Sequence, residues 1–349
     1  MKKQIAFSLV LVLILSLLAG CAGTAVVYLN DCTCPTDGTT PTPTVPVNPP
    51  AEGAVKTGLA IVANASKSAD ASCAEYDVTL VAVTVDDKGV IEQCIIDSIG
   101  TKVEFDNAGV ITKVPESIAT KNELGDSYGM VNFGGAKYEW YQQAAALADY
   151  AEGKTVEQLK NGTITNGYAT EGSDLAASAT IYLGGYVSAI EVAVNNAKHL
   201  GAMAGDELRL ACIPSAKGTN ATAEKSGNTE LTVDTTALTV KEGVITSCYI
   251  DSLQAKVEFD TTGTIKSDIS SFKTKNELGD SYGMVNWGGA KHEWNVQAAN
   301  FAAYVTGKTA AEVSGIAVDT GAKPTDADLS AGVTIAIGGF QALIAKAMK

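Results

Sequence analysis

Two short segments, each present twice, contain the residue types that could carry chemistry. The first reads ELGDSYGM at residues 123–130 and again at 277–284. Each copy places two carboxylates and a phenol around two glycines, and glycine allows a backbone to approach a ligand closely. We expect a ligand-contacting loop here, and a loop that recurs only through duplication is the alternative. The candidate binding residues are Glu123, Gly125, Asp126 and Tyr128, with Glu277, Gly279, Asp280 and Tyr282 in the second copy.

The second segment ends in a threonine. It runs from Asp174 to Thr180 and from Asp328 to Thr334, and it precedes the last helix expected in each half. The free N–H groups and the dipole at a helix N-terminus attract phosphate. Thr180 and Thr334 are therefore candidates for contact with a phosphate-bearing ligand.

Hydrolytic and metal chemistry have little support. The chain has two histidines, His199 and His292, and Tyr138 replaces the second of them in the first copy. Nucleophilic catalysis of the Ser-His-Asp type needs a histidine in the fold, and no carboxylate pair has a spacing that marks it as acid and base. We expect neither catalytic residues nor a metal site, and we favour an electron carrier or binding module over a hydrolase or transferase.

An internal repeat organises the chain. The thirteen residues TKNELGDSYGMVN begin at Thr120 and again at Thr274, and the shift of 154 residues holds without a gap from Val90 to at least Thr180. Self-similarity of this kind predicts duplicated structural units. We predict two domains, 54–204 and 205–349, each large enough to bury its own core.

Within one copy, strand-like residues come first and helical ones follow. Apolar alternation predicts strands at 79–85 and 90–96, with a third at 102–106 and a fourth at 110–112. An apolar stripe begins at Trp140 and ends before Gly153, and final helices are expected at 186–198 and 340–349. This order predicts an α+β fold of two tandem repeats, each an antiparallel sheet followed by packed helices.

The N-terminus has the features of a lipoprotein signal peptide. Lys2 and Lys3 precede an apolar run at 5–18 that is too short for a comfortable membrane span. The run ends in Leu-Ala-Gly-Cys at 18–21, which resembles the lipobox of bacterial lipoproteins. We therefore predict a signal peptide at 1–20, lipidation at Cys21, and an anchor on the outer face of the cell membrane or another extracytoplasmic membrane surface.

A proline-rich spacer follows the predicted anchor. Six of the nine prolines lie at 35–50, and such a composition favours an extended, semi-rigid chain. Residues 21–53 are thus expected to be a lipid-anchored linker that lifts the folded part off the bilayer.

Charge and cysteine content narrow the partners. The formal net charge is −14 and Arg209 is the only arginine, so nucleic acid and anionic membrane surfaces are disfavoured as partners.

Six cysteines besides Cys21 allow fifteen complete disulfide pairings in an oxidising compartment, and the sequence does not choose among them. Buried free thiols are the alternative for Cys94 and Cys248, which occupy matching strand positions.

The layout resembles the FMN-binding domain family, which occurs in a subunit of sodium-pumping quinone reductases and in lipid-anchored flavoproteins of extracellular electron transfer. The resemblance rests on a Val-x-Val-x-x-x-Gly-x-Ile hairpin, a glycine-rich segment opened by Glu, a Trp-led helix ending in Gly-Lys, and an Asp-x-x-Ser-Gly-Ala-Thr motif. It implies that Thr180 and Thr334 could receive FMN through a phosphoester bond. The motif reads Ala-Ser-Ala-Thr at 177–180 and Ala-Gly-Val-Thr at 331–334, so non-covalent flavin, another flat ligand and no cofactor stay open.

The sequence thus favours a lipid-anchored, extracytoplasmic flavin-binding or electron-transfer protein. A membrane reductase and an external electron acceptor are its expected partners. In this interpretation Phe133, Trp287, Tyr138, Trp140 and Trp294 could stack on the flavin ring. A redox-silent surface lipoprotein that binds a small ligand or a protein partner is the competing hypothesis.

Overall fold

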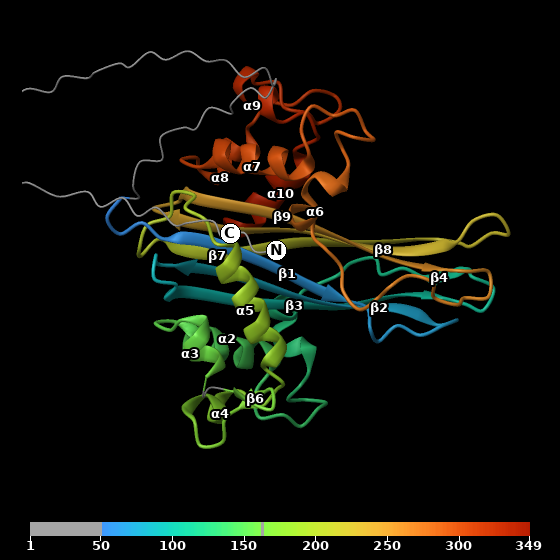
Figure 1. The fold of residues 1–349 in the computed structure, drawn as a ribbon, viewed down its shortest axis with the longest axis horizontal. Helices are drawn as coiled ribbons and strands as arrows, with labels where there is room; N and C mark the ends of the chain where they lie inside the picture. The colour runs from blue at the N-terminus through green and yellow to red at the C-terminus, as the bar shows by residue number, and fades with distance from the viewer. Residues whose placement is uncertain (1–50, 162–163) are drawn as a thin grey trace, which may run out of the picture. The chain divides into compact units, whose positions relative to one another are not determined.

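The computed structural model of the chain describes residues 51–161 and 164–349. The predicted signal peptide, Cys21 and the linker up to residue 50 lie outside these residues, as do Cys32 and Cys34. The described residues belong to one compact unit. They form three antiparallel sheets and ten α-helices, which confirms the mixed α+β class (Figure 1).

The long strands of the first half are rich in β-branched residues, which favour extended backbone. β2 (Cys73–Val85) and β3 (Ile91–Phe105) pair as an antiparallel hairpin. Its turn is closed by Asp86, whose Oδ1 accepts the backbone N–H groups of Lys88 and Val90, each at 2.8 Å. The separate third strand predicted at 102–106 is wrong, because those residues continue β3 without a break.

Two larger sheets contain most of the strands. The first has the order β1-β2-β3-β4, with β1 at Lys56–Asn64 and β4 at Ile111–Lys113. The second has the order β7-β8-β9, in which β7 is Glu207–Thr219, β8 is Gly227–Lys241 and β9 is Val244–Phe259. A small hairpin joins β5 (Ile164–Thr165) to β6 (Tyr168–Ala169).

Helices cover the outer face of each large sheet. The first sheet carries α2 (Trp140–Ala151), α3 (Val156–Lys160) and α5 (Gly184–Asn196), while the second carries α7 (Trp294–Val305), α8 (Ala310–Ser314) and α10 (Gly338–Ala347). Figure 1 shows the resulting layers, with one group of helices on either side of the paired sheets. The predicted helix that begins at Trp140 and stops before Gly153 is confirmed.

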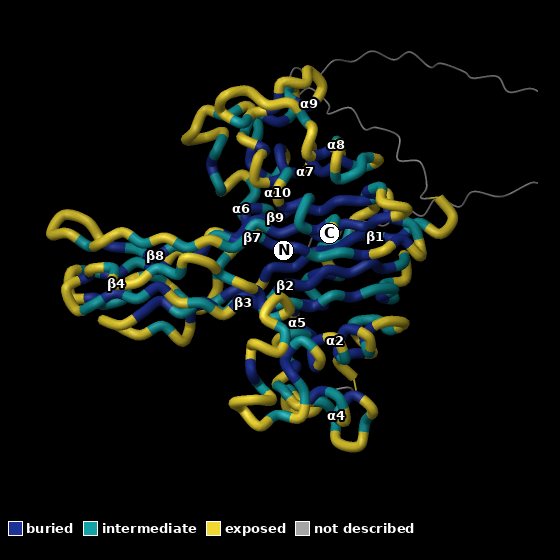
Figure 2. The backbone as a smooth tube through the Cα atoms, turned by 180° about the vertical axis from the view of Figure 1, so that it is seen from behind, coloured by how far each residue is buried: buried dark blue, intermediate teal, exposed yellow. Residues whose placement is uncertain are grey.

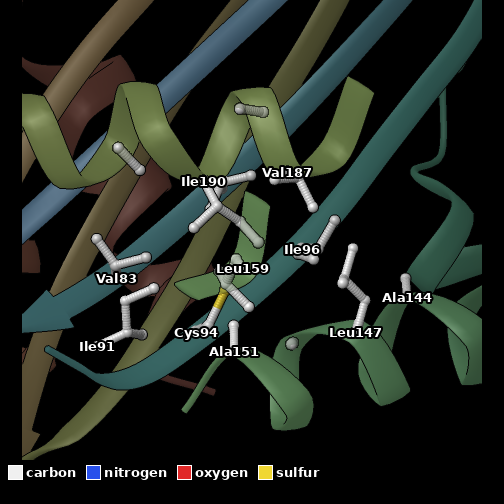
Figure 3. Packing of buried hydrophobic residues seen from close by; sticks show 14 of the residues in the cluster. Val83, Ile91, Cys94, Ile96, Ala144, Leu147, Ala151, Leu159, Val187 and Ile190 are labelled. Carbon is white, nitrogen blue, oxygen red and sulfur yellow. The ribbon is translucent and has the colours of Figure 1, made fainter. Parts of the chain in front are cut away.

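The outer face of the first sheet is packed against its helices through small and branched side chains. In Figure 3, Val83, Cys94 and Ile96 on the strands meet Leu147 on α2 and Ile190 on α5. The equivalent cluster of the second half contains Phe301 and Phe340 among its buried residues. Burial of these side chains supplies most of the free energy that holds the helices to the sheets.

The inner faces of the two sheets pack against each other. One buried cluster draws on both, and it includes Leu80, Ile99, Val233 and Leu253. Figure 2 shows these central strands as almost continuously buried. Phe105 and Phe259, which occupy matching positions, stack with ring centroids 4.1 Å apart and planes 6° from parallel.

Two matching glycines make reciprocal contacts between the sheets. A Cβ added to Gly109 would lie 2.6 Å from the carbonyl oxygen of Asp260, and one added to Gly263 would lie 2.5 Å from that of Asp106. Both glycines have a positive φ, of 67° and 70°. Only glycine fits at these two approaches.

The four cysteines in the described part of the chain, Cys73, Cys94, Cys212 and Cys248, are buried free thiols. The buried-thiol alternative for Cys94 and Cys248 is therefore confirmed. Burial raises the pKa of Cys212 and of Cys248 to about 12. Across residues 51–161 and 164–349, no helix combines the length and the apolar character that crossing a bilayer requires.

Candidate functional site

A buried glutamine on α2 holds the first candidate threonine. The Oε1 atom of Gln143 accepts hydrogen bonds from Thr180 N at 2.8 Å, Thr180 Oγ1 at 3.2 Å and Ile181 N at 3.1 Å. Its Nε2 donates to the carbonyl of Tyr138 at 2.9 Å, so both ends of the amide make hydrogen bonds. Gln143 is fully buried while Thr180 is exposed, so a rigid inner group positions a solvent-accessible hydroxyl.

The second half repeats this arrangement. Gln297, also fully buried, accepts from Thr334 N at 2.7 Å, Thr334 Oγ1 at 3.2 Å and Ile335 N at 3.2 Å. Its Nε2 donates to the carbonyl of His292 at 2.8 Å. Thr334 is half-buried, so neither threonine is packed in the interior.

A cavity of about 420 Å³ in the first half is lined by Ile181, the residue after Thr180, and we call it the Thr180 cavity. It lies between the central residues of β2 and β3, the ELGDSYGM segment and the first turn of α5. Its volume falls within the range of small-molecule sites. The lining residues are Lys67, Asp77, Thr79, Ser98, Lys121, Tyr128, Met130, Trp140, Ile181, Tyr182, Gly185 and Tyr186.

Aromatic side chains and a lysine are ordered along this cavity. The indole N–H of Trp140 donates to the hydroxyl of Tyr186 at 2.9 Å, and the two rings meet edge to face at 5.8 Å. Lys121 Nζ lies 5.0 Å from the Trp140 ring centroid and 5.2 Å from that of Tyr128. Burial raises the pKa of Tyr128, so its phenol stays protonated at neutral pH.

A second lysine reaches the same cavity from the strand side. Lys67 Nζ lies 2.7 Å from Asp77 Oδ2, and this hydrogen bond raises the pKa of Lys67. Asp77 is the one carboxylate that lines the cavity, and Lys67 already neutralises it. Lys121 is therefore the lysine of the lining that has no carboxylate partner among the lining residues.

The glycine-rich turn after the ELGDSYGM segment is fastened by a buried carboxylate. Glu139, at the N-cap of α2, accepts the backbone N–H groups of Met130 at 2.8 Å and Val131 at 2.9 Å. Phe133 folds back over Gly129 and is 91% exposed, and it does not line the cavity. Trp287, its counterpart, is 83% exposed.

The ELGDSYGM segment is helical where we expected a loop. It forms α1 (Lys121–Leu124) and a 3-10 turn, η1 (Gly125–Tyr128), and the second copy forms α6 (Lys275–Leu278) and η2 (Gly279–Tyr282). The capping boxes at the starts of α1 and α6 explain the difference. Gly125 and Gly279 end these helices with φ of 51° and 49°.

The predicted residues of the first copy separate into different roles. Tyr128 lines the Thr180 cavity. Glu123 instead completes the capping box with Thr120 and forms an ion pair with Lys346 of α10 at 2.5 Å. Asp126 is exposed and accepts a hydrogen bond from the Tyr141 hydroxyl at 3.2 Å.

The second copy differs in detail. Glu277 completes the capping box with Thr274, and Asp280 is exposed. The Tyr282 hydroxyl donates to Gln254 Oε1 at 3.0 Å. Lys275 Nζ lies 4.8 Å from the Trp294 ring centroid, and burial lowers the pKa of Lys275.

Sequence reasoning missed the two glutamines that position the threonines. Gln143 and Gln297 are identical residues at matching positions of the repeat, and each falls on the buried face of its helix. A polar residue on an otherwise apolar helix face was the available signal, because a buried amide requires hydrogen-bond partners.

Other chemistry gains no support from the fold. Within the described part of the chain, no three His, Cys, Asp or Glu side chains come together as a metal site would require. His199 lies on the surface, where its Nε2 is 3.0 Å from Asp87 Oδ1. Comparisons of the chain with protein-family models, curated proteins and solved structures find no match.

Proposed function

We propose that this chain is a lipid-anchored, extracytoplasmic flavoprotein that carries electrons, with FMN held beside Thr180 and Thr334. One observation carries the proposal: Thr180 is exposed, and the next residue, Ile181, lines a cavity together with aromatic rings and lysines. FMN combines a flat ring with a phosphate, and these are the two chemistries that this lining accommodates.

The residues present fit such a cofactor in the first half. Trp140, Tyr182 and Tyr186 offer faces and edges to a planar ring, and Lys121 offers positive charge to a phosphate. Gln143 accepts a hydrogen bond from the hydroxyl of Thr180, and the next residue, Ile181, lines the cavity. When bound, flavin supplies the electron-accepting ring, while the protein supplies position, exclusion of water and charge.

The fit is weaker in the second half, where Ala336 stands at the position of Tyr182. The same glutamine contact nevertheless holds Thr334. We therefore expect the first half to bind FMN more tightly than the second.

We further propose that the fold is a tandem duplication with domains 54–204 and 205–349. The matching order of β1-β2-β3 and β7-β8-β9 supports this, as do the matching helices on each sheet. The reciprocal contacts of Gly109 and Gly263 are those of two copies related by a two-fold axis.

Lipidation of Cys21 would tether the flavin domains to the membrane through the proline-rich linker at 21–53. A membrane reductase would then deliver electrons and an external acceptor would remove them. The departures from Ser-Gly-Ala-Thr at 177–180 and 331–334 favour the competing function, a redox-silent surface lipoprotein that binds a small ligand or a protein partner.

The decisive experiment is to produce the full chain in a host that supplies flavin and a flavin transferase. We expect the visible spectrum of oxidised flavin, and intact mass distinguishes a phosphoester from non-covalent binding. Thr180→Ala should abolish a covalent adduct in the first half while leaving the one at Thr334. A colourless chain of unmodified mass that also fails to take up added FMN would refute the electron-carrier function.

Two matched variants test the roles of the surrounding residues. Tyr182→Ala installs the residue found at position 336 and should weaken FMN binding in the first half. Gln143→Leu removes the hydrogen bonds to Thr180 and should lower flavin content there, whereas Gln297→Leu should affect only the second half. Equal effects of both glutamine variants on both halves would contradict local positioning.

A further inference from the structure

A second cavity lies where the two halves of the chain meet. It has a volume of about 380 Å³ and is bounded by β9, α7 and the segment that follows α5. It shares no lining residue with the Thr180 cavity. We call it the Tyr249 cavity, and it is lined by Lys198, Leu200, Cys248, Tyr249, Ile250, Asn276, Asn295, Val296, Ala299, Asn300, Ala302, Ala303 and Thr306.

The lining contains a lysine and no carboxylate, although the chain carries a net charge of −14. Lys198 forms no ion pair with any described residue, and its Nζ lies 5.3 Å from the Tyr249 ring centroid. Burial, with Asp251 and Glu277 nearby, raises the pKa of Tyr249 to about 12, so its phenol remains a hydrogen-bond donor. An anionic group at this end would meet an ammonium and a hydroxyl.

The side chain of Asn295 also lines this cavity. The Oδ1 atom of Asn295 is buried and has no hydrogen-bond partner among the described residues. A buried amide oxygen without a partner carries a desolvation penalty, which a ligand N–H or O–H would relieve. Val296, Ala299 and Ala303 of α7 add apolar surface to the lining.

The matching helix of the first half carries a large ring and acidic side chains. Tyr141, Asp149 and Glu152 stand on α2 where α7 has Asn295, Ala303 and Thr306. The Tyr141 hydroxyl donates a hydrogen bond to Asp126. Burial raises the pKa of Cys94, and the negative charges of Glu152 and Asp149 add to this rise. The second half has therefore replaced one large ring and two carboxylates with smaller neutral side chains along one helix face.

A smaller hollow beside β3 in the first half differs from the Tyr249 cavity in charge. It has a volume of about 280 Å³, and its lysine, Lys346, is already paired with Glu123 at 2.5 Å. The free cation of the Tyr249 cavity thus has no equivalent there.

We propose that the Tyr249 cavity binds a small organic monoanion with an apolar body and one N–H or O–H donor. The carboxylate lies against Lys198 and Tyr249, and the body lies along α7. Because Asn295 Oδ1 is buried, the donor reaches it once the Asn295 amide has turned toward the cavity. A volume near the lower end of the usual range limits the ligand to a compact molecule. Zwitterionic amino acids are disfavoured because no carboxylate lines the cavity to receive their ammonium group.

Indole-3-acetate is a suitable probe because it has one carboxylate, a flat apolar body and one N–H. Its neutral analogue indole-3-acetamide tests the role of Lys198, and 1-naphthaleneacetate, which lacks the N–H, tests that of Asn295. The measurement is isothermal titration calorimetry on the full chain in a non-ionic detergent, with detergent alone as blank. We expect indole-3-acetate to bind about tenfold more tightly than either analogue.

Variants locate the binding. Lys198→Gln should weaken indole-3-acetate about tenfold, while Lys88→Gln, an exposed control, should leave it unchanged. The double variant Ala303→Asp with Thr306→Glu installs the acidic pair of the first half and should abolish binding. Circular dichroism checks that each variant keeps its fold.

Three results would overturn the proposal. They are the absence of heat with all three probes at millimolar concentration, equal affinity for all three, and undiminished binding by the folded double variant. Because the site is separate from Thr180, failure of this test leaves the flavin proposal intact, and a colourless chain would leave this one intact.

Discussion

Asp251 predicts an unusual dependence of stability on pH. Its carboxylate is 5% exposed and accepts the backbone N–H groups of Ser252 at 2.7 Å and Asn276 at 3.1 Å. Burial outweighs these hydrogen bonds and raises the pKa of Asp251 from 3.8 to about 6. The folded chain therefore retains a proton that the unfolded chain releases between about pH 4 and about pH 6.

The sign and size of the effect follow from this shift. Because the folded pKa is the higher one, the contribution is fully present below the unfolded pKa and is lost as the pH rises to the folded pKa. A shift of about two units corresponds to about 3 kcal/mol over the whole window. Between about pH 5 and about pH 8, which avoids the isoelectric region, about 1.4 kcal/mol of it should appear.

Asp251→Asn removes the titration and keeps an acceptor for the two N–H groups. Urea unfolding followed by tryptophan fluorescence should show that the variant gains about 1.4 kcal/mol relative to the wild type between about pH 5 and about pH 8. Asp97→Asn, at the matching position, should show the same direction because burial also raises the pKa of Asp97.

Asp260→Asn is the control. Lys266 lowers the pKa of this exposed carboxyl, so its titration falls below the tested range and its effect on stability should not change between the two pH values. A difference between wild type and Asp251→Asn that is independent of pH would refute the reasoning.

Two further predictions concern packing and thiol reactivity. Gly58→Ala should destabilise the chain by about 2 kcal/mol in urea unfolding, because its Cβ would lie 2.1 Å from the carbonyl oxygen of Ala193 on α5. Gly100→Ala, whose Cβ meets nothing nearer than 4.0 Å, should leave the unfolding midpoint nearly unchanged, and equal midpoints for both variants would contradict this. Cys212 and Cys248, each with a pKa near 12, should react with a disulfide reagent at least about a thousandfold more slowly in the native chain than in urea. Rapid labelling of either thiol under native conditions would show that it is not buried.

The elements with strong periodicity were predictable. The stripe from Trp140 and the stop at Gly153 define α2 to within two residues. Residues 97–101, in contrast, contain Asp, Ser, Gly and Thr and resemble a turn, yet Ile99 pairs with Val78 and is buried in the shared inner core. Tertiary burial therefore overrides local composition there.

The sequence interpretation did not predict that the two sheets pack against each other, although the run of apolar residues at the end of β2 pointed to it. Residues 80–85 are six consecutive buried positions, a pattern typical of a strand covered on both faces. The Thr180 site was found in part: Tyr128 lines the cavity, and so does Ile181, the residue after Thr180. Lys67 could not be assigned to it, because only the fold brings that residue to Asp77 and Tyr128.

The stack of Phe105 on Phe259 has a consequence for the chain cut in half. A polypeptide that contained only one of the two halves would expose the apolar inner face of its sheet. The same face of a second molecule would then be the surface that matches it. We therefore expect a gene for a single unit to yield a symmetric homodimer, and fusing two such genes would let each outer face diverge while the shared interior stayed fixed.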